Sequence, residues 1–258
     1  MRLFTFAPSH FSEKARWALD RTGLAYTEER QTPLLHRLAL RRVGAGPSVP
    51  ALVLPGRVLK DSPSILQFAD GHLPPERRLY PEEPELRRLV EEYERKVGKE
   101  IGLSVPRWAY FYLLSRKDLV LQLFSPGVGR GQLLVFSWLF PLIRFLMRKG
   151  LGINRESTRR MEARISAHLE EAAGLLAGKD YLFGDRFTAA DLSLAALTAP
   201  LLGTPGYGGT LAPFAEMPEE ARQTAEIWRR HPVASYVERI YKLHRGELFA
   251  RTSPNATR

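Results

Sequence analysis

The sequence of 258 residues contains no cysteine. This absence excludes disulfide bonds, thiolate metal sites and cysteine nucleophiles within the chain, and it fits a reducing compartment. Long apolar runs are also missing: the most apolar segment, LLVFSWLFPLI at residues 133–143, is too short to span a bilayer and contains a proline. The start, MRLFTFAPSHF, lacks the apolar stretch typical of a signal peptide. We therefore expect a soluble, cytoplasmic protein.

Acidic residues are scarce relative to basic ones, with 28 Asp and Glu against 38 Lys and Arg and a net charge of +10. Residues 101–150 hold seven basic residues, nine aromatic residues and a single acid, Asp118. Amphipathic helices with solvated basic side chains explain this window best. The alternative is a surface for anionic ligands or membrane headgroups. No nucleic-acid-binding motif is recognisable, so no nucleic-acid partner is expected.

Strand and helix patterns alternate over the first 80 residues, whereas only helical patterns follow residue 84. The order expected for the first part is strand-helix-strand-helix-strand-strand-helix, with a hairpin at Pro55-Gly56. Strands are expected at 2–7, 24–30, 50–54 and 57–59, and helices at 11–22, at 33–42 and from residue 61. The later helices are expected at 85–115, 132–149, 156–177, 189–199, 218–230 and 233–245.

These patterns predict a small α/β domain followed by an all-helical domain. We place the α/β domain at residues 1–75, a proline- and charge-rich linker at 76–84 and the helical domain at 85–248. A long insertion at about 101–150 enlarges the helical domain, and residues 249–258 are expected to be a disordered tail.

The first turn between strand and helix contains Ser9-His10-Phe11-Ser12. A redox protein would place C-x-x-C at such a turn, but here both ends carry a hydroxyl group. A serine hydrolase is excluded as an explanation, because the chain has no G-x-S-x-G turn and no evident acid to orient His10.

Four segments resemble motifs of the glutathione S-transferase superfamily, in the right order and over nearly the whole chain. They are SHFSEKARWAL, which is similar to the serine-type S-x-F-x-x-[KR]-x-R-x-A-L motif, SVPALV, DSPSIL and YLFGDRFTAADLSLAAL. The resemblance implies a thioredoxin-like N-terminal domain that binds glutathione, an all-α C-terminal domain and a homodimer. In the last segment Thr188 and Asp191 have the spacing of a capping box, which is a structural feature.

The resemblance also implies a glutathione site. Ser9 would face the glutathione sulfur, and Val49, beside a cis Pro50, would pair with the peptide backbone of glutathione. Asp61 and Ser62 would bind the γ-glutamyl ammonium and carboxylate at a helix N-terminus. The alternatives are an ordinary proline at a strand start and simple helix caps. Asp61 is one methylene shorter than the glutamate that is usual in the family.

Ser9 can act on a sulfur atom that the ligand supplies. A free thiol is mostly protonated at neutral pH, whereas the thiolate is the nucleophile. A hydroxyl group that donates a hydrogen bond to the thiolate, beside a helix N-terminus, lowers the pKa of that thiol. The alternative is that Ser9 only caps the first helix.

The leading hypothesis is a glutathione transferase of the kind used in detoxification, which joins glutathione to a small apolar electrophile without a metal. The candidate pocket residues for the electrophile are His10, Phe11, Trp108 and Tyr112. The aromatic residues of the insertion can equally pack a larger core or a dimer interface, and a partly exposed imidazole is the default for His10. Two other functions stay open: a non-catalytic carrier with this fold, and a peripheral membrane or interaction protein that uses the basic aromatic insertion.

Overall fold

A four-stranded sheet with the order β2-β1-β3-β4 forms the centre of the N-terminal domain in the computed structural model, which describes residues 1–212 and 214–246. β1 pairs in parallel with β2, and β3 pairs antiparallel with both β1 and β4. The strands are β1 (Arg2–Phe6), β2 (Thr27–Gln31), β3 (Ala51–Leu54) and β4 (Arg57–Leu59).

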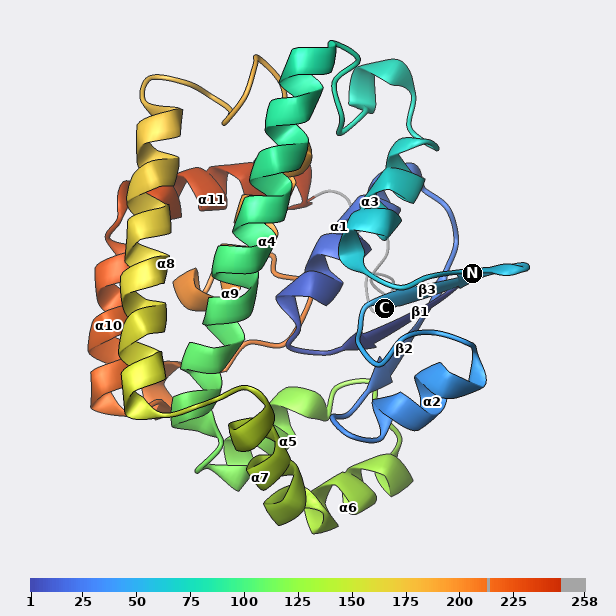
Figure 1. Ribbon diagram of the computed structural model, residues 1–258, viewed down its shortest axis with the longest axis vertical. Coiled ribbons are helices and arrows are strands. Elements are labelled where there is room, and N and C mark those ends of the chain that lie inside the picture. The colour runs from blue at the N-terminus through green and yellow to red at the C-terminus, as the bar shows by residue number, and fades with distance from the viewer. Residues whose placement is uncertain (213, 247–258) are drawn as a thin grey trace.

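Helices cover both faces of this sheet, as Figure 1 shows. The helices of this domain are α1 (His10–Thr22), α2 (His36–Arg42) and α3 (Ser62–Asp70). Successive residues of a strand point to opposite faces: Leu3 packs in a cluster with residues of α1 and α3, whereas Phe4 packs with Leu40 of α2. Pro55-Gly56 connects β3 to β4 with a φ of 69° at Gly56, the conformation that favours glycine in a tight turn. The expected order of strands and helices is confirmed.

The helical domain is built around α9, in which almost every residue is buried. Its main helices are α4 (Pro84–Leu113), α8 (Arg155–Leu176), α9 (Ala189–Leu202), α10 (Glu219–Arg229) and α11 (Pro232–His244). Asp191 accepts hydrogen bonds from the backbone N–H and the hydroxyl of Thr188, each at 2.8 Å. It also accepts from the backbone N–H of Leu182, so this carboxylate fixes both the start of α9 and the preceding loop.

The insertion differs from the prediction. It forms three short helices, α5 (Lys117–Phe124), α6 (Arg130–Trp138) and α7 (Phe140–Gly150), where the sequence pattern predicted one helix at 132–149. The axes of α6 and α7 differ by 70°. Pro141 explains the break, because it has no N–H to donate to the carbonyl four residues earlier. A short 3₁₀ turn at Pro75–Arg77 overlaps the start of the expected linker, and the expected tail at 249–258 lies outside the described residues.

Candidate active site

The residues assigned to glutathione binding meet at one edge of the sheet. β1 and β4 run in the same direction, because each pairs antiparallel with β3. The carboxyl ends of β1 and β4 therefore lie at the same edge as the amino end of β3. Ser9 follows β1, Val49-Pro50 precedes β3 and Asp61-Ser62 follows β4. Ser9 and Val49, which are 40 residues apart in the sequence, are thus placed beside neighbouring strands.

Ser9 is the N-cap residue of α1. Its Oγ accepts a hydrogen bond from the backbone N–H of Ser12 at 3.2 Å, so the capping role exists. A hydroxyl group has one proton to donate besides its acceptor lone pairs. Among residues 1–212 and 214–246 no group accepts that proton. Ser9 therefore caps the helix and keeps a donor, while it also lines a large cavity.

Val49 and Asp61 differ in how they face this cavity. The Val49–Pro50 peptide bond is cis, and Val49 lines the cavity. Asp61 is exposed and caps α3: its Oδ1 accepts from the backbone N–H of Ser64 at 2.9 Å and from the Ser64 hydroxyl at 2.6 Å. Ser62 is buried at the first position of α3. Neither Asp61 nor Ser62 lines the cavity, which lies on the other side of Val49 from them in strand order.

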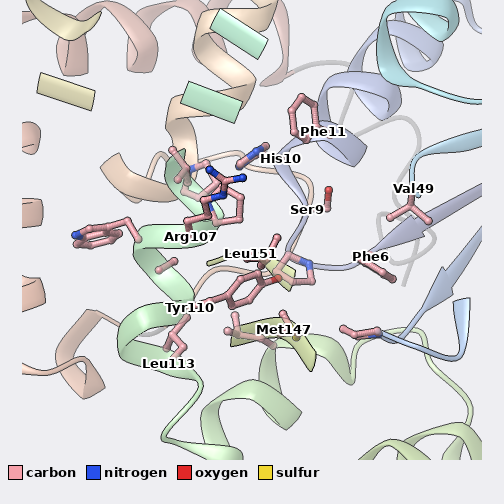
Figure 2. A pocket seen from close by; sticks show the side chains of 18 of the residues that line it. Phe6, Ser9, His10, Phe11, Val49, Arg107, Tyr110, Leu113, Met147 and Leu151 are labelled. Carbon is pink, nitrogen blue, oxygen red and sulfur yellow. The ribbon is translucent and has the colours of Figure 1, made fainter. Parts of the chain in front are cut away.

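The cavity has a volume of about 910 Å³ and lies between the N-terminal domain and the helices α4 and α7 (Figure 2). Its wall is mostly apolar and includes Phe6, Phe11, Tyr110, Leu113, Met147 and Leu151. Pockets for drug-sized ligands range from about 300 to 1,000 Å³. The cavity is therefore large enough for a small organic molecule placed next to the Ser9 hydroxyl.

Three of the four residues proposed for the electrophile pocket line this cavity, namely His10, Phe11 and Trp108. Tyr112 does not. Its side chain packs edge-on against Trp108 with ring centroids 5.5 Å apart, and its hydroxyl donates to Glu162 of α8 at 3.4 Å. Tyr112 is thus part of the contact between α4 and α8 and is a core residue.

His10 is buried, with 5% of its surface exposed, and this corrects the expectation of a partly exposed imidazole. Its Nε2 lies 3.0 Å from the carbonyl oxygen of Gly102, which can only accept, so Nε2 carries the proton. Burial lowers the pKa of His10 to about 4, although the hydrogen bond to Gly102 opposes this shift. The imidazole is therefore neutral at neutral pH and adds no positive charge next to Ser9.

Sequence reasoning missed three cations on the cavity wall, Arg37, Arg107 and Lys149. Arg107 projects from α4 among the apolar lining side chains (Figure 2). Within the described part of the chain its guanidinium has no hydrogen-bond or ion-pair partner. The only signal in the sequence was the position of Arg107 inside an aromatic stretch.

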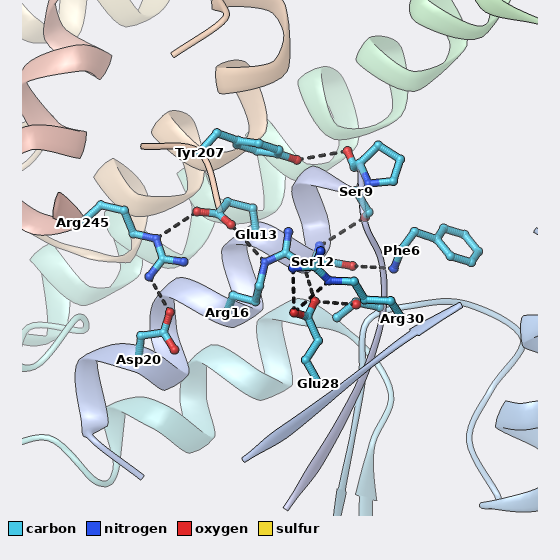
Figure 3. Close-up of polar contacts among 12 residues, drawn as sticks. Phe6, Ser9, Ser12, Glu13, Arg16, Asp20, Glu28, Arg30, Tyr207 and Arg245 are labelled. Atoms are coloured by element: carbon cyan, nitrogen blue, oxygen red, sulfur yellow. Dashed lines mark hydrogen bonds and ion pairs between the residues drawn. The ribbon is translucent and has the colours of Figure 1, made fainter. Parts of the chain in front are cut away.

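A buried charge network lies beneath the Ser9 turn (Figure 3). Arg16 bonds Glu13 at 3.1 Å and Glu28 of β2 at 2.7 Å, and Arg245 bonds Glu13 at 3.0 Å and Asp20 at 2.5 Å. The network ties α1 to β2 and to the end of α11. These residues hold α1 in position against β2 and α11, and they do not line the cavity.

The loop after α9 holds the same turn from the other side. Thr210 donates its backbone N–H to the carbonyl of Ala7 at 3.0 Å, and the Tyr207 hydroxyl donates to the carbonyl of Pro8 at 3.0 Å. A Cβ on Gly209 would lie 2.4 Å from the oxygen of Ala7, so only glycine allows this approach. The backbone just before Ser9 is therefore fixed by the helical domain.

One further group of ligand-type side chains, Glu100, His168 and Glu171, has polar atoms within 4.8 Å of one another. Both ring nitrogens of His168 already have partners, Glu100 at 2.8 Å and the Tyr93 hydroxyl at 3.2 Å. Glu171 bonds Lys96 at 2.6 Å. Because these contacts satisfy one another between α4 and α8, we assign the group a structural role.

Comparisons with known proteins agree with the two-domain architecture. A family model described as the N-terminal domain of glutathione S-transferase matches residues 3–77, and one described as the C-terminal domain matches residues 155–239. No curated protein shows significant sequence similarity to the chain.

Solved structures with a similar fold include three bacterial proteins. A glutathione S-transferase from Methylobacterium radiotolerans, in complex with glutathione sulfonate, is 22% identical with a TM-score of 0.60, over 100% of this chain and 96% of that one. The β-etherase from a Sphingobium strain is 18% identical with a TM-score of 0.65, over 97% and 99% of the two chains. Maleylacetoacetate isomerase from Methylobacterium extorquens, with bound malonate and glutathione, is 20% identical with a TM-score of 0.55, over 100% and 98%. With both family models in the order of the observed domains, the chain belongs to the glutathione S-transferase superfamily.

Proposed function

We propose that this protein is an enzyme that activates the thiol of glutathione at Ser9 for attack on an apolar electrophile in the cavity. The observation that carries the proposal is the position of the Ser9 hydroxyl, which caps α1 and faces an apolar cavity with its proton available. A hydrogen bond from this hydroxyl, together with the positive end of the α1 dipole, favours the thiolate over the thiol. The serine stays uncharged throughout.

The sheet edge has the right length for the rest of glutathione. An extended tripeptide spans about 10 Å. The connections that carry Ser9 and Asp61 are separated by two strand spacings of about 4.8 Å each. We infer that the sulfur lies at Ser9, that the cysteinyl backbone pairs with Val49, and that the γ-glutamyl end reaches Ser62 at the N-terminus of α3. This extended pose explains why Asp61 and Ser62 lie outside the cavity that receives the second substrate.

The wall of the cavity indicates the class of that second substrate. Its apolar side chains favour an apolar compound, while the unpartnered guanidinium of Arg107 adds a fixed positive charge. A guanidinium fork matches the geometry of a carboxylate. We infer that the preferred electrophile combines an apolar body with an anionic group. Thiolate attack then gains from proximity, because both reactants are held in one enclosed site.

Calorimetric titration with reduced glutathione tests the glutathione site. We expect binding in the micromolar to low-millimolar range, and we expect Ser62→Ala to weaken it about tenfold, because a hydrogen bond to a charged carboxylate is worth about 1.5–3 kcal/mol. Ser64→Ala is the matched control, since the Ser64 hydroxyl bonds only Asp61 and lies two residues further along α3. Absence of binding at several millimolar glutathione would contradict the proposed glutathione site.

Replacing Arg107 by methionine tests the anionic substrate class. Methionine keeps the apolar stem and removes the charge, so we expect the KM for an aromatic carboxylate electrophile to rise about 10- to 100-fold. The KM for an uncharged analogue of similar shape should change less than twofold. Arg95→Met serves as the control for loss of a cation from α4, because Arg95 is exposed and does not line the cavity. Equal losses for both substrates would contradict a charge-specific role of Arg107.

A further inference from the structure

The outer surface of α6 and α7 exposes large apolar side chains. Leu134 is 72% exposed, Trp138 81% and Phe145 60%. Among the described residues twelve large hydrophobic side chains are exposed, and six of them lie on these two helices: Leu134, Val135, Trp138, Leu142, Phe145 and Leu146. Single exposed apolar residues are ordinary, but six of them within residues 134–146 of two adjacent helices indicate a contact surface. We call this group the α6–α7 face.

The α6–α7 face is separated from the core by the inner side of the same helices. Phe136 and Ile143 point inward and are buried, at 0% and 2% exposure. Leu134 and Trp138 are four residues apart, as are Leu142 and Leu146, and this spacing places each pair on one side of its helix. The exposed residues therefore do not result from a disordered loop. Each helix has one apolar side that is buried and further apolar side chains that no other part of the described structure covers.

Charge decides which partner fits this face. No Asp or Glu occurs between Leu119 and Asn154. The same helices carry four exposed basic residues, Arg130, Arg144, Arg148 and Lys149. Helices that combine exposed apolar side chains with charges of positive sign only are typical of helices that lie on anionic membranes, where aromatic residues are at the headgroup level. A second copy of the chain would bring the same cations and another net charge of +10 to the contact.

The geometry favours a helix pair that lies on a bilayer over one that crosses it. In residues 1–212 and 214–246 no single helix is long and apolar enough to span a membrane; only α6 and α7 together reach that length, and they bend by 70°. The pair packs mainly on α5 and on itself. Figure 1 shows α5, α6 and α7 gathered at one end of the molecule, where a flat surface can approach them.

We propose that the α6–α7 face docks this protein on the surface of an anionic lipid bilayer. Trp138 and Phe145 enter the boundary between headgroups and acyl chains, and Arg144 and Arg148 bind lipid phosphates and carboxylates. α7 contributes Leu146, which belongs to the α6–α7 face, and Met147 to the cavity wall. Docking therefore brings the cavity close to the layer in which apolar compounds concentrate. The surface contact itself does not depend on the glutathione chemistry proposed above.

Co-sedimentation with lipid vesicles tests the proposal. The full chain is mixed with vesicles of phosphatidylcholine alone or with added phosphatidylserine, at low and at moderate salt. We expect binding to the anionic vesicles that weakens as salt rises. Arg144→Glu/Arg148→Glu should lower the partition coefficient at least about 30-fold, since each basic residue near an anionic surface contributes about fivefold. Trp138→Ser/Phe145→Ser should abolish binding at both salt concentrations.

Matched controls separate the α6–α7 face from general surface effects. Ile227→Ser/Leu243→Ser removes two apolar side chains of similar exposure, 69% and 59%, from α10 and α11. Arg95→Glu/Lys99→Glu reverses two exposed charges with the same four-residue spacing on α4. Both controls should bind anionic vesicles as the wild type does. Circular dichroism spectra of all four variants test whether they keep their helices.

Fluorescence adds a direct readout, because Trp138 is the only exposed one of four tryptophans, all of which lie in the described residues. Anionic vesicles should shift its emission to the blue and protect it from a soluble quencher. The proposal is overturned if the wild type does not bind anionic vesicles. It is equally overturned if the variants of the α6–α7 face bind these vesicles as strongly as the control variants do. It is also overturned if light scattering shows a dimer that Trp138→Ser/Phe145→Ser converts to a monomer, because a second copy would then cover the face.

Discussion

Replacing Arg245 by methionine is expected to lower the free energy of unfolding by about 3–5 kcal/mol, the cost of leaving a buried ion partner uncompensated. Arg245 is 1% exposed and bonds Glu13 and Asp20, which are themselves buried. In the network of Figure 3 three carboxylates, of Glu13, Asp20 and Glu28, face the guanidinium groups of Arg16, Arg30 and Arg245. Loss of one cation leaves a net negative charge in the interior.

The free energy of unfolding of this variant should also depend on pH differently from that of the wild type. Burial raises the pKa of Glu13, but Arg245 and Arg16 outweigh burial and hold it below its usual value. Without Arg245 the pKa of Glu13 in the folded protein should rise, so the folded variant gains a proton more readily as the pH falls. The stability difference from the wild type should therefore narrow between pH 7 and pH 4. Urea denaturation of the wild type and the variant at several pH values measures this difference in the free energy of unfolding.

Lys242→Met is the matched control for Arg245→Met. Lys242 lies on the same helix end, but it is exposed, so its replacement should change the free energy of unfolding by less than about 0.5 kcal/mol. A loss below about 1 kcal/mol for Arg245→Met, equal at all pH values, would mean that water reaches the network and replaces the missing charge.

The parts of the fold that the sequence predicted are those with local causes. The Pro55-Gly56 turn, the Thr188–Asp191 cap and the alternation of strand and helix patterns each depend on residues within a few positions of one another. The break between α6 and α7 has a local cause too, Pro141, but the apolar pattern continues through it and predicted one helix. The short α5 was missed because its eight residues are fewer than the roughly 11–18 over which a helical period is recognised.

Only those residues of the candidate site that lie in the motif segments could be predicted from the sequence. Ser9, Val49, Asp61 and Ser62 were predicted from segments that resemble family motifs, and the strand directions place these four residues at one end of the sheet. The orientation of side chains around α4 was not predictable. Whether residue 107 or residue 112 faces the cavity depends on how α4 packs against α8, and Glu162 of α8 holds Tyr112 away from it.

Contacts between segments far apart in the sequence also set the position of Ser9. Thr210 and Tyr207 bond the carbonyls just before it, and nothing in the sequence of either segment indicates this pairing. The burial of His10 has the same origin, since its partner Gly102 is 92 residues away. The close approach of Phe11 to Gly102, where a Cβ would lie 2.3 Å from the ring, completes this contact between the domains.

Replacing Ser9 by alanine is expected to lower kcat/KM for glutathione transfer about 10- to 100-fold at neutral pH. A hydrogen bond to a charged group is worth about 1.5–3 kcal/mol, which corresponds to a rise of about 1–2 units in the pKa of the bound thiol. His10 cannot compensate, because burial holds its pKa at about 4 and it is neutral at neutral pH. The ultraviolet absorbance of the thiolate, followed against pH with glutathione bound, measures the pKa directly.

The same variant loses the cap of α1, at a cost of about 1 kcal/mol in stability, so two controls are needed. Ser9→Thr keeps both the cap and the hydroxyl proton and should retain a low thiol pKa. Ser12→Ala removes the hydroxyl that accepts from the N–H of Phe6, and it disturbs the turn without removing the donor to sulfur. If Ser9→Ala loses stability but leaves the thiol pKa and the pH–rate profile unchanged, Ser9 is only a helix cap. If the pH–rate profile moves by the same amount as the thiol pKa while Ser12→Ala leaves both in place, the hydroxyl proton of Ser9 is the group that stabilises the thiolate.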